Sequence, residues 1–165
     1  MKYIPMLELM KKAKCGGYAV PAFACWNAEI ISVVLRTGQE MNSPVIIMGA
    51  PVDLDEIEPE EYGKVAYAVA EQYDVPAALL LDHGDTMERV KRCIDSGFTS
   101  IMLDYSTRPY AENVTALREV VKLAKDRGVT VEGEIGTVGQ VDGITTEGTH
   151  ANALTDPDEA REYVK

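Results

Sequence analysis

Short apolar segments alternate with longer amphipathic segments along the whole chain. Five of the apolar segments read as β-strands, and they span residues 18–23, 44–48, 77–82, 100–104 and 130–134. Their apolar character is continuous and does not alternate with polar positions, which is typical of strands in a parallel sheet covered on both faces. We therefore predict five parallel strands that are buried on both faces.

The segments between these strands carry apolar residues at the three- and four-residue spacing of one helix face. A capping Asn27 opens the first such segment, a proline opens the second, and the next two stop at Gly97 and Gly128. A short fifth helix should begin near Thr155, where Asp156 precedes an acidic first turn. The four longer helices are predicted over residues 27–41, 59–73, 86–96 and 111–127.

Strands that alternate with helices predict an α/β fold, and two architectures share this pattern. A doubly wound open sheet usually has a glycine-rich loop after its first strand, whereas residues 22–27 read AFACWN. This favours the (β/α)₈ barrel of the TIM type, which needs about 250 residues. We expect this chain of 165 residues to be a single partial barrel domain, 1–165, with five β/α units, or else an unusual five-stranded sheet.

Composition and charge narrow the classes of function. The formal net charge of −11 argues against nucleic-acid binding, which needs a basic surface. It does not exclude a small anionic substrate, which backbone N–H groups and one or two cations can hold. Three widely spaced cysteines form neither a disulfide framework nor a metal-binding spacing, which predicts a cytoplasmic protein. We expect no signal peptide and no membrane span, since no long apolar run occurs.

Acidic residues end three of the five predicted strands. They are Asp82, Asp104 and Glu134, and His83 follows Asp82 directly. Active sites of parallel α/β folds lie at the carboxyl ends of the strands, so these four residues indicate a site. Neighbouring side chains of a strand point apart, but Gly84 would let the backbone turn so that both Asp82 and His83 face one cavity. The alternative is that the acids cap helices or bind loop N–H groups.

Several segments, in this order, resemble one known family. They are LDHG at 81–84, LDYS at 103–106 followed by ENV at 112–114, EGEIGTVG at 132–139 and LTDPDEA at 154–160. Together with Ala22, Phe23 and Asn27, they resemble the class II, zinc-dependent ketose-bisphosphate aldolases, which include the fructose- and tagatose-bisphosphate enzymes. The resemblance covers the whole chain, and the ordered set is more specific than LDHG alone.

The resemblance implies a lyase of carbohydrate metabolism, glycolysis included. Such an enzyme reversibly cleaves a small phosphorylated sugar, a ketose bisphosphate, to dihydroxyacetone phosphate and an aldehyde. By resemblance, Asp82 is the proton donor to the aldehyde oxygen, and His83 is one of three histidine ligands of Zn²⁺. Asp104 and Glu134 correspond to carboxylates that can hold the metal in a more buried position, and Asn27 to a residue near the substrate. Zn²⁺ would polarise the substrate carbonyl as a Lewis acid.

Several positions depart from the family pattern, among them Asp142 and Gly49. The family's base lies in a mobile loop after the fifth strand, in a motif resembling GGxED, and here residues 139–143 read GQVDG. Asp142 therefore stands where the catalytic glutamate is expected, one methylene shorter, although a simple turn would explain the same residues. Gly49 stands where a serine often contacts the substrate, which makes it a candidate substrate-binding position. These changes bear on the identity of the sugar more than on the fold.

The resemblance also implies two further zinc-binding histidines and glycine-rich phosphate loops on later strands, which we expect outside these 165 residues. The other histidine, His150, lies in a polar segment and is not expected to be a ligand. We predict that this chain alone lacks appreciable aldolase activity, and that the full-length protein is active and homo-oligomeric. Two alternatives stay open. One is a non-catalytic metal-binding or interaction half-barrel that needs a partner chain. The other is a different barrel lyase, with a divalent metal on His83, Asp104 and Glu134.

Overall fold

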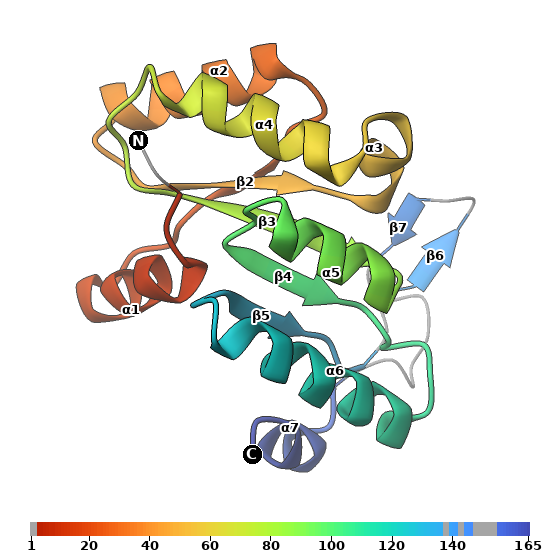
Figure 1. Cartoon of the computed structure of the whole chain (residues 1–165). Coiled ribbons are helices and arrows are strands. Elements are labelled where there is room, and N and C mark those ends of the chain that lie inside the picture. Colours follow the sequence, from red (N-terminus) through yellow and green to blue (C-terminus); the bar gives the residue numbers. More distant parts are fainter. Residues whose placement is uncertain (1–2, 137–138, 142–143, 147–154) are drawn as a thin grey trace.

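The computed structural model describes residues 3–136, 139–141, 144–146 and 155–165, and its strands and helices alternate along the chain (Figure 1). The strands are β1 (Ala22–Ala24), β2 (Val45–Gly49), β3 (Ala77–Gly84), β4 (Ser100–Leu103), β5 (Thr130–Gly133), β6 (Gly139–Val141) and β7 (Ile144–Thr146). The helices are α1 (Met6–Gly16), α2 (Ala28–Glu40), α3 (Pro51–Glu56), α4 (Pro59–Ala70), α5 (Met87–Asp95), α6 (Tyr110–Lys125) and α7 (Pro157–Tyr163).

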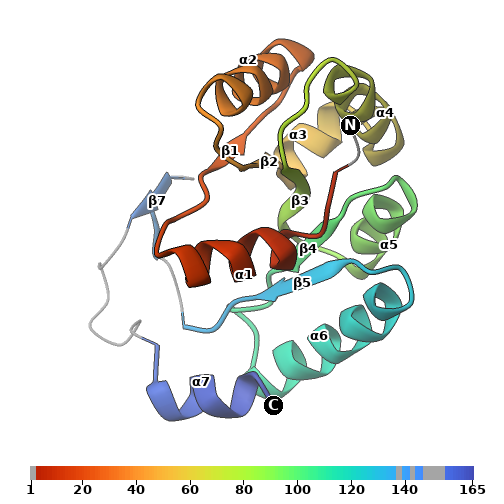
Figure 2. The same ribbon diagram turned by 90° about the vertical axis from the view of Figure 1, so that its left-hand side faces the viewer.

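The first five strands form one parallel sheet, as predicted, and their order in it is β1-β2-β3-β4-β5. Each strand pairs with the next one along the chain, whereas a doubly wound sheet reverses its strand order at one point. Figure 2 shows the sheet curving around α1, with α2, α4, α5 and α6 on its outer side. This is the arrangement of a partial barrel, and it places the carboxyl ends of all five strands along one edge. The short strands β6 and β7 form a separate antiparallel hairpin.

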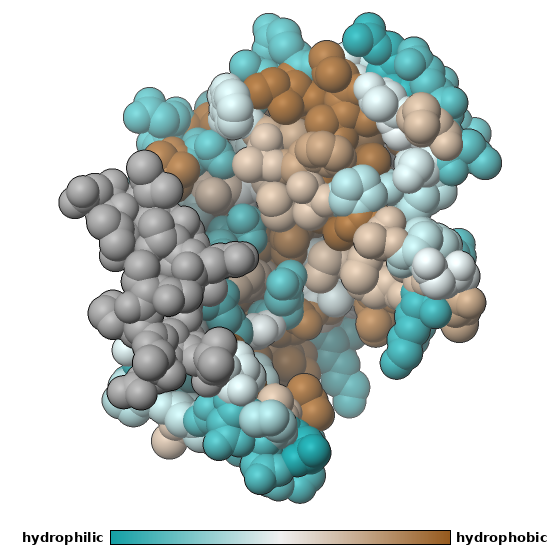
Figure 3. All heavy atoms as spheres, turned by 180° about the vertical axis from the view of Figure 1, so that it is seen from behind, coloured by the Kyte–Doolittle hydropathy of each residue, from teal (hydrophilic) through white to brown (hydrophobic). Residues whose placement is uncertain are grey.

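Alternate residues of the strands pack into two apolar layers, which explains why the strand segments are apolar throughout. The outer layer lies under the helices and includes Ile47, Leu79, Leu81, Ile101 and Leu103. The inner layer lies against α1 and consists of Leu9, Ile46, Ala78, Leu80 and Met102. Figure 3 views the side opposite Figure 1, where hydrophobic residues gather across the middle of the face beside a hollow.

Helix α1 lies outside the predicted alternation and closes the amino end of the sheet. Three backbone N–H groups at its start donate to the first residues of β3, β4 and β5: Ile4 to the Ala77 carbonyl (2.9 Å), Met6 to the Ser100 hydroxyl (3.0 Å) and Leu7 to the Thr130 hydroxyl (3.0 Å). Only Leu9 and Ala13 of this helix are buried, so its apolar stripe is short. With the amino end covered, the opposite edge of the sheet is the one left for a site.

The predicted helix boundaries are confirmed at several ends. Asn27 Oδ1 accepts a hydrogen bond from the N–H of Ile30 (2.9 Å), which caps α2. Gly97 and Gly128 have φ angles of 89° and 66°, the left-handed conformation that ends α5 and α6. Asp156 caps α7 by accepting from the N–H of the residues at its start.

The first predicted strand is wrong in extent, because β1 covers only Ala22–Ala24 instead of residues 18–23. Pro21 accepts a hydrogen bond from Ile46 through its carbonyl (2.9 Å) but has no N–H to donate. Pairing therefore starts after Pro21, and this edge strand stays exposed.

In the described part of the chain, none of the helices combines the length and apolarity that a membrane crossing requires.

Candidate active site

The end of β3 carries Asp82 and His83, and an irregularity in its pairing with β4 places them. Both residues stand opposite the single residue Met102, which is a β-bulge. His83 has φ of 47°, a left-handed conformation that residues other than glycine rarely adopt. A strained backbone conformation persists only where the surrounding structure holds it, and such residues cluster at functional sites. The bulge therefore breaks the strict alternation of side chains where the strand reaches the edge of the sheet.

Gly84 has a different role from the one predicted. The left-handed residue is His83, and Gly84 does not have a positive φ. What Gly84 provides is space, because a Cβ there would lie 2.6 Å from the Met102 carbonyl oxygen and 2.7 Å from a methyl carbon of Leu81. The predicted turn is present, but it occurs one residue earlier, and Gly84 lets β4 approach closely behind it.

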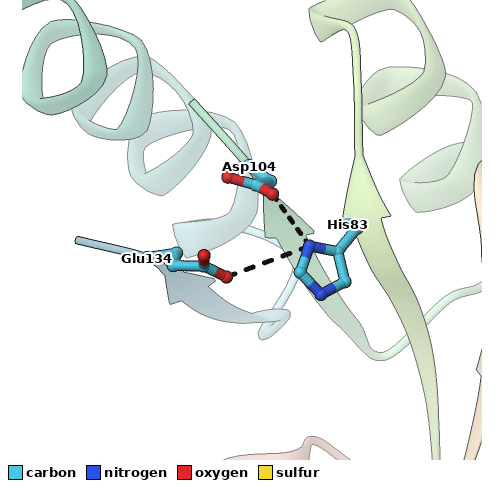
Figure 4. Close-up of side chains that lie close together, drawn as sticks. All are labelled: His83, Asp104 and Glu134. Atoms are coloured by element: carbon cyan, nitrogen blue, oxygen red, sulfur yellow. Dashed lines mark hydrogen bonds and ion pairs between the residues drawn. The ribbon is translucent and has the colours of Figure 1, made fainter. Parts of the chain in front are cut away.

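The structure brings together His83, Asp104 and Glu134, three of the residues singled out from the sequence (Figure 4). The Nδ1 atom of His83 lies 2.8 Å from Oδ2 of Asp104 and 3.9 Å from Oε2 of Glu134. His83 is the second-to-last residue of β3, and the two acids directly follow β4 and β5. The cluster is accessible, since half of the His83 side chain and about a fifth of each carboxylate side chain are exposed.

The Asp104 carboxylate is held on both of its oxygens. Oδ1 accepts hydrogen bonds from the backbone N–H of Ser106 (3.0 Å) and from its hydroxyl (2.6 Å), while Oδ2 faces His83. Burial alone would raise the pKa of Asp104, but the hydrogen bonds from Ser106 and His83 outweigh it and lower the pKa below its ordinary value. Asp104 is therefore an oriented anion that aligns the imidazole of His83.

Other carboxyl groups at this edge hold their protons more strongly than free acids do. Burial raises the pKa of Asp82, with His83 opposing the shift and the charge of Asp104 adding to it. Burial also raises the pKa of Glu134, and again Asp104 adds to the shift. Several acids at close range repel one another when all are ionised. A bound cation would relieve this repulsion.

The donor atoms of His83, Asp104 and Glu134 all lie within 4.8 Å of one another. Zn²⁺ binds imidazole nitrogen and carboxylate oxygen at about 2.0–2.2 Å, and catalytic zinc sites use three protein ligands with a further position open. One imidazole and two carboxylates converging at this separation fit a divalent metal of this kind. The arrangement can thus hold a metal at the open edge of the sheet, next to the half-buried acid Asp82.

Glu132 belongs to the same region, although it was not singled out from the sequence. It pairs in register with Met102 and so lies on the inner face of the sheet, like Glu134 two positions later. Burial raises its pKa, and the charge of Asp82 adds to this. The signal was the Glu-Gly-Glu spacing at 132–134, which puts two acids on one face of β5.

The remaining predicted site residues are not part of the cluster of His83, Asp104 and Glu134. Asn27 follows β1 at the same edge of the sheet, where its side chain caps α2. Gly49 ends β2 and is buried against Tyr62, so that a Cβ at position 49 would lie 3.0 Å from the Tyr62 ring. The candidate base Asp142 and the second histidine, His150, lie outside the described residues.

A partial barrel with its acids and histidine at the carboxyl edge defines a barrel-type α/β protein with the layout of a metal-dependent enzyme. Comparison with known families makes this specific: the chain belongs to the class II fructose-bisphosphate aldolase family, whose model matches residues 4–165. The family resemblance predicted from the motifs is thereby confirmed.

Solved structures of aldolases show the same fold. The chain is similar to the YdjI aldolase from Escherichia coli K12, with 30% identity and a TM-score of 0.83 over 98% of this chain and 60% of that chain. A protein from Coccidioides immitis assigned as a fructose-1,6-bisphosphate aldolase has 32% identity and a TM-score of 0.83, over 96% and 56%. The fructose-bisphosphate aldolase from Campylobacter jejuni shares the fold at 24% identity and a TM-score of 0.72, over 81% and 48%. The chain therefore spans between about half and 60% of the length of these proteins.

Proposed function

We propose that the protein carrying this chain is a Zn²⁺-dependent aldolase. It would reversibly cleave a ketose bisphosphate to dihydroxyacetone phosphate and an aldehyde. The observation that carries the proposal is the convergence of His83, Asp104 and Glu134 beside Asp82, at the carboxyl edge of the sheet, in a chain of this aldolase family.

His83, Asp104 and Glu134 would hold the metal, with further ligands supplied from outside these residues. When bound, Zn²⁺ polarises the substrate carbonyl as a Lewis acid. The Nδ1 atom of His83 and Oδ2 of Asp104 lie 2.8 Å apart, and the metal would take the place of the proton between them. Asp82 would donate a proton to the aldehyde oxygen, and its raised pKa suits an acid that must keep its proton above the ordinary range of aspartate.

Three further assignments belong to the proposal and come from the family resemblance. Asn27 would lie near the substrate, since it stands at the end of β1 on the same edge as the acid cluster. Gly49, at the end of β2, would lie beside the substrate, at a position where a serine is frequent in the family. Asp142 would act as the second proton-transfer group. A cytoplasmic location and a homo-oligomeric state of the full-length protein are likewise part of the proposal.

The test uses the full-length protein that carries this chain. Release of dihydroxyacetone phosphate is followed from fructose 1,6-bisphosphate and from tagatose 1,6-bisphosphate, and bound metal is quantified by elemental analysis. We expect chelation to abolish cleavage, Zn²⁺ to restore it, and His83→Ala to lose both metal and at least about 100-fold in activity. The matched control is Asp95→Ala, which removes an exposed carboxylate whose partner is Arg127 at a distance from the cluster.

Two outcomes would contradict the proposal. Cleavage that survives chelation, or that His83→Ala leaves intact, would show that this cluster does not hold the working metal. Stoichiometric metal binding that depends on His83, but without cleavage of either sugar, would instead favour a non-catalytic metal-binding module or a different lyase.

A further inference from the structure

Asn113 is a buried polar residue that the proposed chemistry does not use. It lies in α6 within the ENV segment, is 3% exposed, and is one of two buried polar side chains among the described residues. Burying an amide costs free energy unless its donors and acceptors are satisfied, so such a residue needs specific partners.

The partners of Asn113 connect it to the candidate metal centre. Its Nδ2 group donates a hydrogen bond to the backbone carbonyl of Glu134 at 2.7 Å, and its Oδ1 accepts one from the Tyr163 hydroxyl at 3.2 Å. Asn113 thus joins three elements: α6, the segment after β5, and α7. Glu134 comes directly after Gly133, the last residue of β5 that pairs with β4, so the regular sheet hydrogen bonds end just before it.

Packing around Gly133 supports the same connection. A Cβ at position 133 would lie 2.3 Å from a methyl carbon of Leu117 in α6 and 2.5 Å from the Tyr163 hydroxyl in α7. Both helices therefore pack directly against the backbone that leads into Glu134. The orientation of the Glu134 peptide determines where its carboxylate lies, and that carboxylate is 3.9 Å from Nδ1 of His83.

We propose that Asn113 is a positioning residue of the metal centre, which holds the Glu134 backbone so that its carboxylate faces His83 and Asp104. Tyr163 supports it by fixing the amide from the other side. This inference rests on the proposed function, because it requires Glu134 to be a metal ligand. It assigns a role to the ENV segment and gives α7 a connection to the site.

The experiment measures metal binding by the full-length protein, with Co²⁺ as the probe for its visible absorption spectrum and Zn²⁺ in competition. Asn113→Leu removes both hydrogen bonds at nearly constant volume, and Asn113→Asp removes the donor alone. We expect each to weaken metal binding about tenfold, as loss of groups behind metal ligands does, and to change the Co²⁺ spectrum. Tyr163→Phe should give a smaller change in the same direction.

The matched control is Val120→Ala, a fully buried position of the same helix whose side chain makes no polar contact. It should lower the melting temperature while leaving the metal dissociation constant and the Co²⁺ spectrum unchanged. If Asn113→Leu fails to fold, Asn113→Asp and Tyr163→Phe carry the test.

Failure of this inference differs from failure of the proposed function. If His83→Ala weakens metal binding while the folded Asn113 and Tyr163 variants keep the affinity and spectrum of the unmodified protein, Asn113 has only a packing role and the inference is overturned. If His83→Ala also leaves metal binding unchanged, the cluster is not the metal site, and the proposed function is overturned together with the inference.

Discussion

His83 and Asp104 meet at 2.8 Å between Nδ1 and Oδ2, although they are 21 residues apart in the sequence. The contact depends on the bulge in β3, which turns His83 out of the regular strand, and on Ser106, which holds the other oxygen of Asp104. The relationship links the protonation of the imidazole to a carboxylate whose orientation is fixed.

We expect His83 to titrate above its ordinary pKa of 6.5 in the metal-free protein. Burial alone would lower the pKa, but the hydrogen bond to Asp104 and the charges of Asp82, Asp104 and Glu134 outweigh it. Because the folded-state pKa is raised, this pairing stabilises the protein fully below pH 6.5, and the stabilisation is lost as the pH rises through the folded-state pKa. An NMR titration that follows the imidazole Cε1–H group measures this pKa.

The control for this titration is Asp104→Asn, which removes the negative charge and should lower the pKa of His83. The titration uses the 165-residue chain, which has two histidines, so His150→Gln leaves a single imidazole signal to follow. A pKa of His83 at or below 6.5 in the unmodified sequence would contradict the prediction.

Asp82→Asn should lower kcat of the full-length enzyme by about 10²–10⁴-fold, the usual contribution of a positioned general acid. The amide has nearly the same shape as the carboxyl group, so KM and zinc content should change little. Steady-state kinetics and metal analysis test this together. Glu88→Gln, at an exposed acid in the first turn of α5, serves as the matched control and should leave kcat unchanged. A kcat for Asp82→Asn equal to that of the control would remove Asp82 from the reaction.

The sequence predicts the meeting of His83, Asp104 and Glu134 because of a simple property of parallel sheets. Neighbouring strands end at the same edge, so an acid or histidine that ends an apolar segment must lie near its counterparts on adjacent strands. No knowledge of side-chain conformations is needed for this step.

Other features depend on contacts that a local pattern does not contain. The bulge at Asp82 and His83 arises only when β3 is paired with β4, so its strained residue could not be assigned from the strand alone. Asn113 reads locally as an ordinary polar residue of a helix, because its partner is the carbonyl of Glu134, 21 residues further on. Helix α1 was missed for the same reason, since its hydrogen bonds reach the starts of β3, β4 and β5.

Gly84→Ala should destabilise both the fold and the metal centre. Its Cβ would lie 2.6 Å from the Met102 carbonyl oxygen, so β4 must move away from the bulge that carries His83. Crowding of this kind costs about 1–3 kcal/mol in the free energy of unfolding. Denaturant unfolding measures that cost, and Co²⁺ binding to the full-length protein measures the effect on the site.

Gly63→Ala is the matched control for Gly84→Ala. Its Cβ would lie 2.4 Å from the Ser96 carbonyl oxygen, in the contact of α4 with the end of α5, where no candidate ligand lies. It should lose stability in the same range while metal affinity stays unchanged. Equal metal affinity in both variants would show that the space at Gly84 matters for stability alone.

Two substitutions at Asn27 separate helix capping from substrate contact. Asn27→Ala removes the acceptor for the N–H of Ile30, which lies 2.9 Å from Oδ1, and should lower the free energy of unfolding by about 1 kcal/mol. Asn27→Asp keeps that acceptor and suits the positive end of the helix dipole, so stability should be preserved. If Asn27 lies near a phosphorylated sugar, the new negative charge should raise KM in Asn27→Asp about tenfold with little change in unfolding. An unchanged KM in the full-length enzyme would leave Asn27 with the cap of α2 as its whole role.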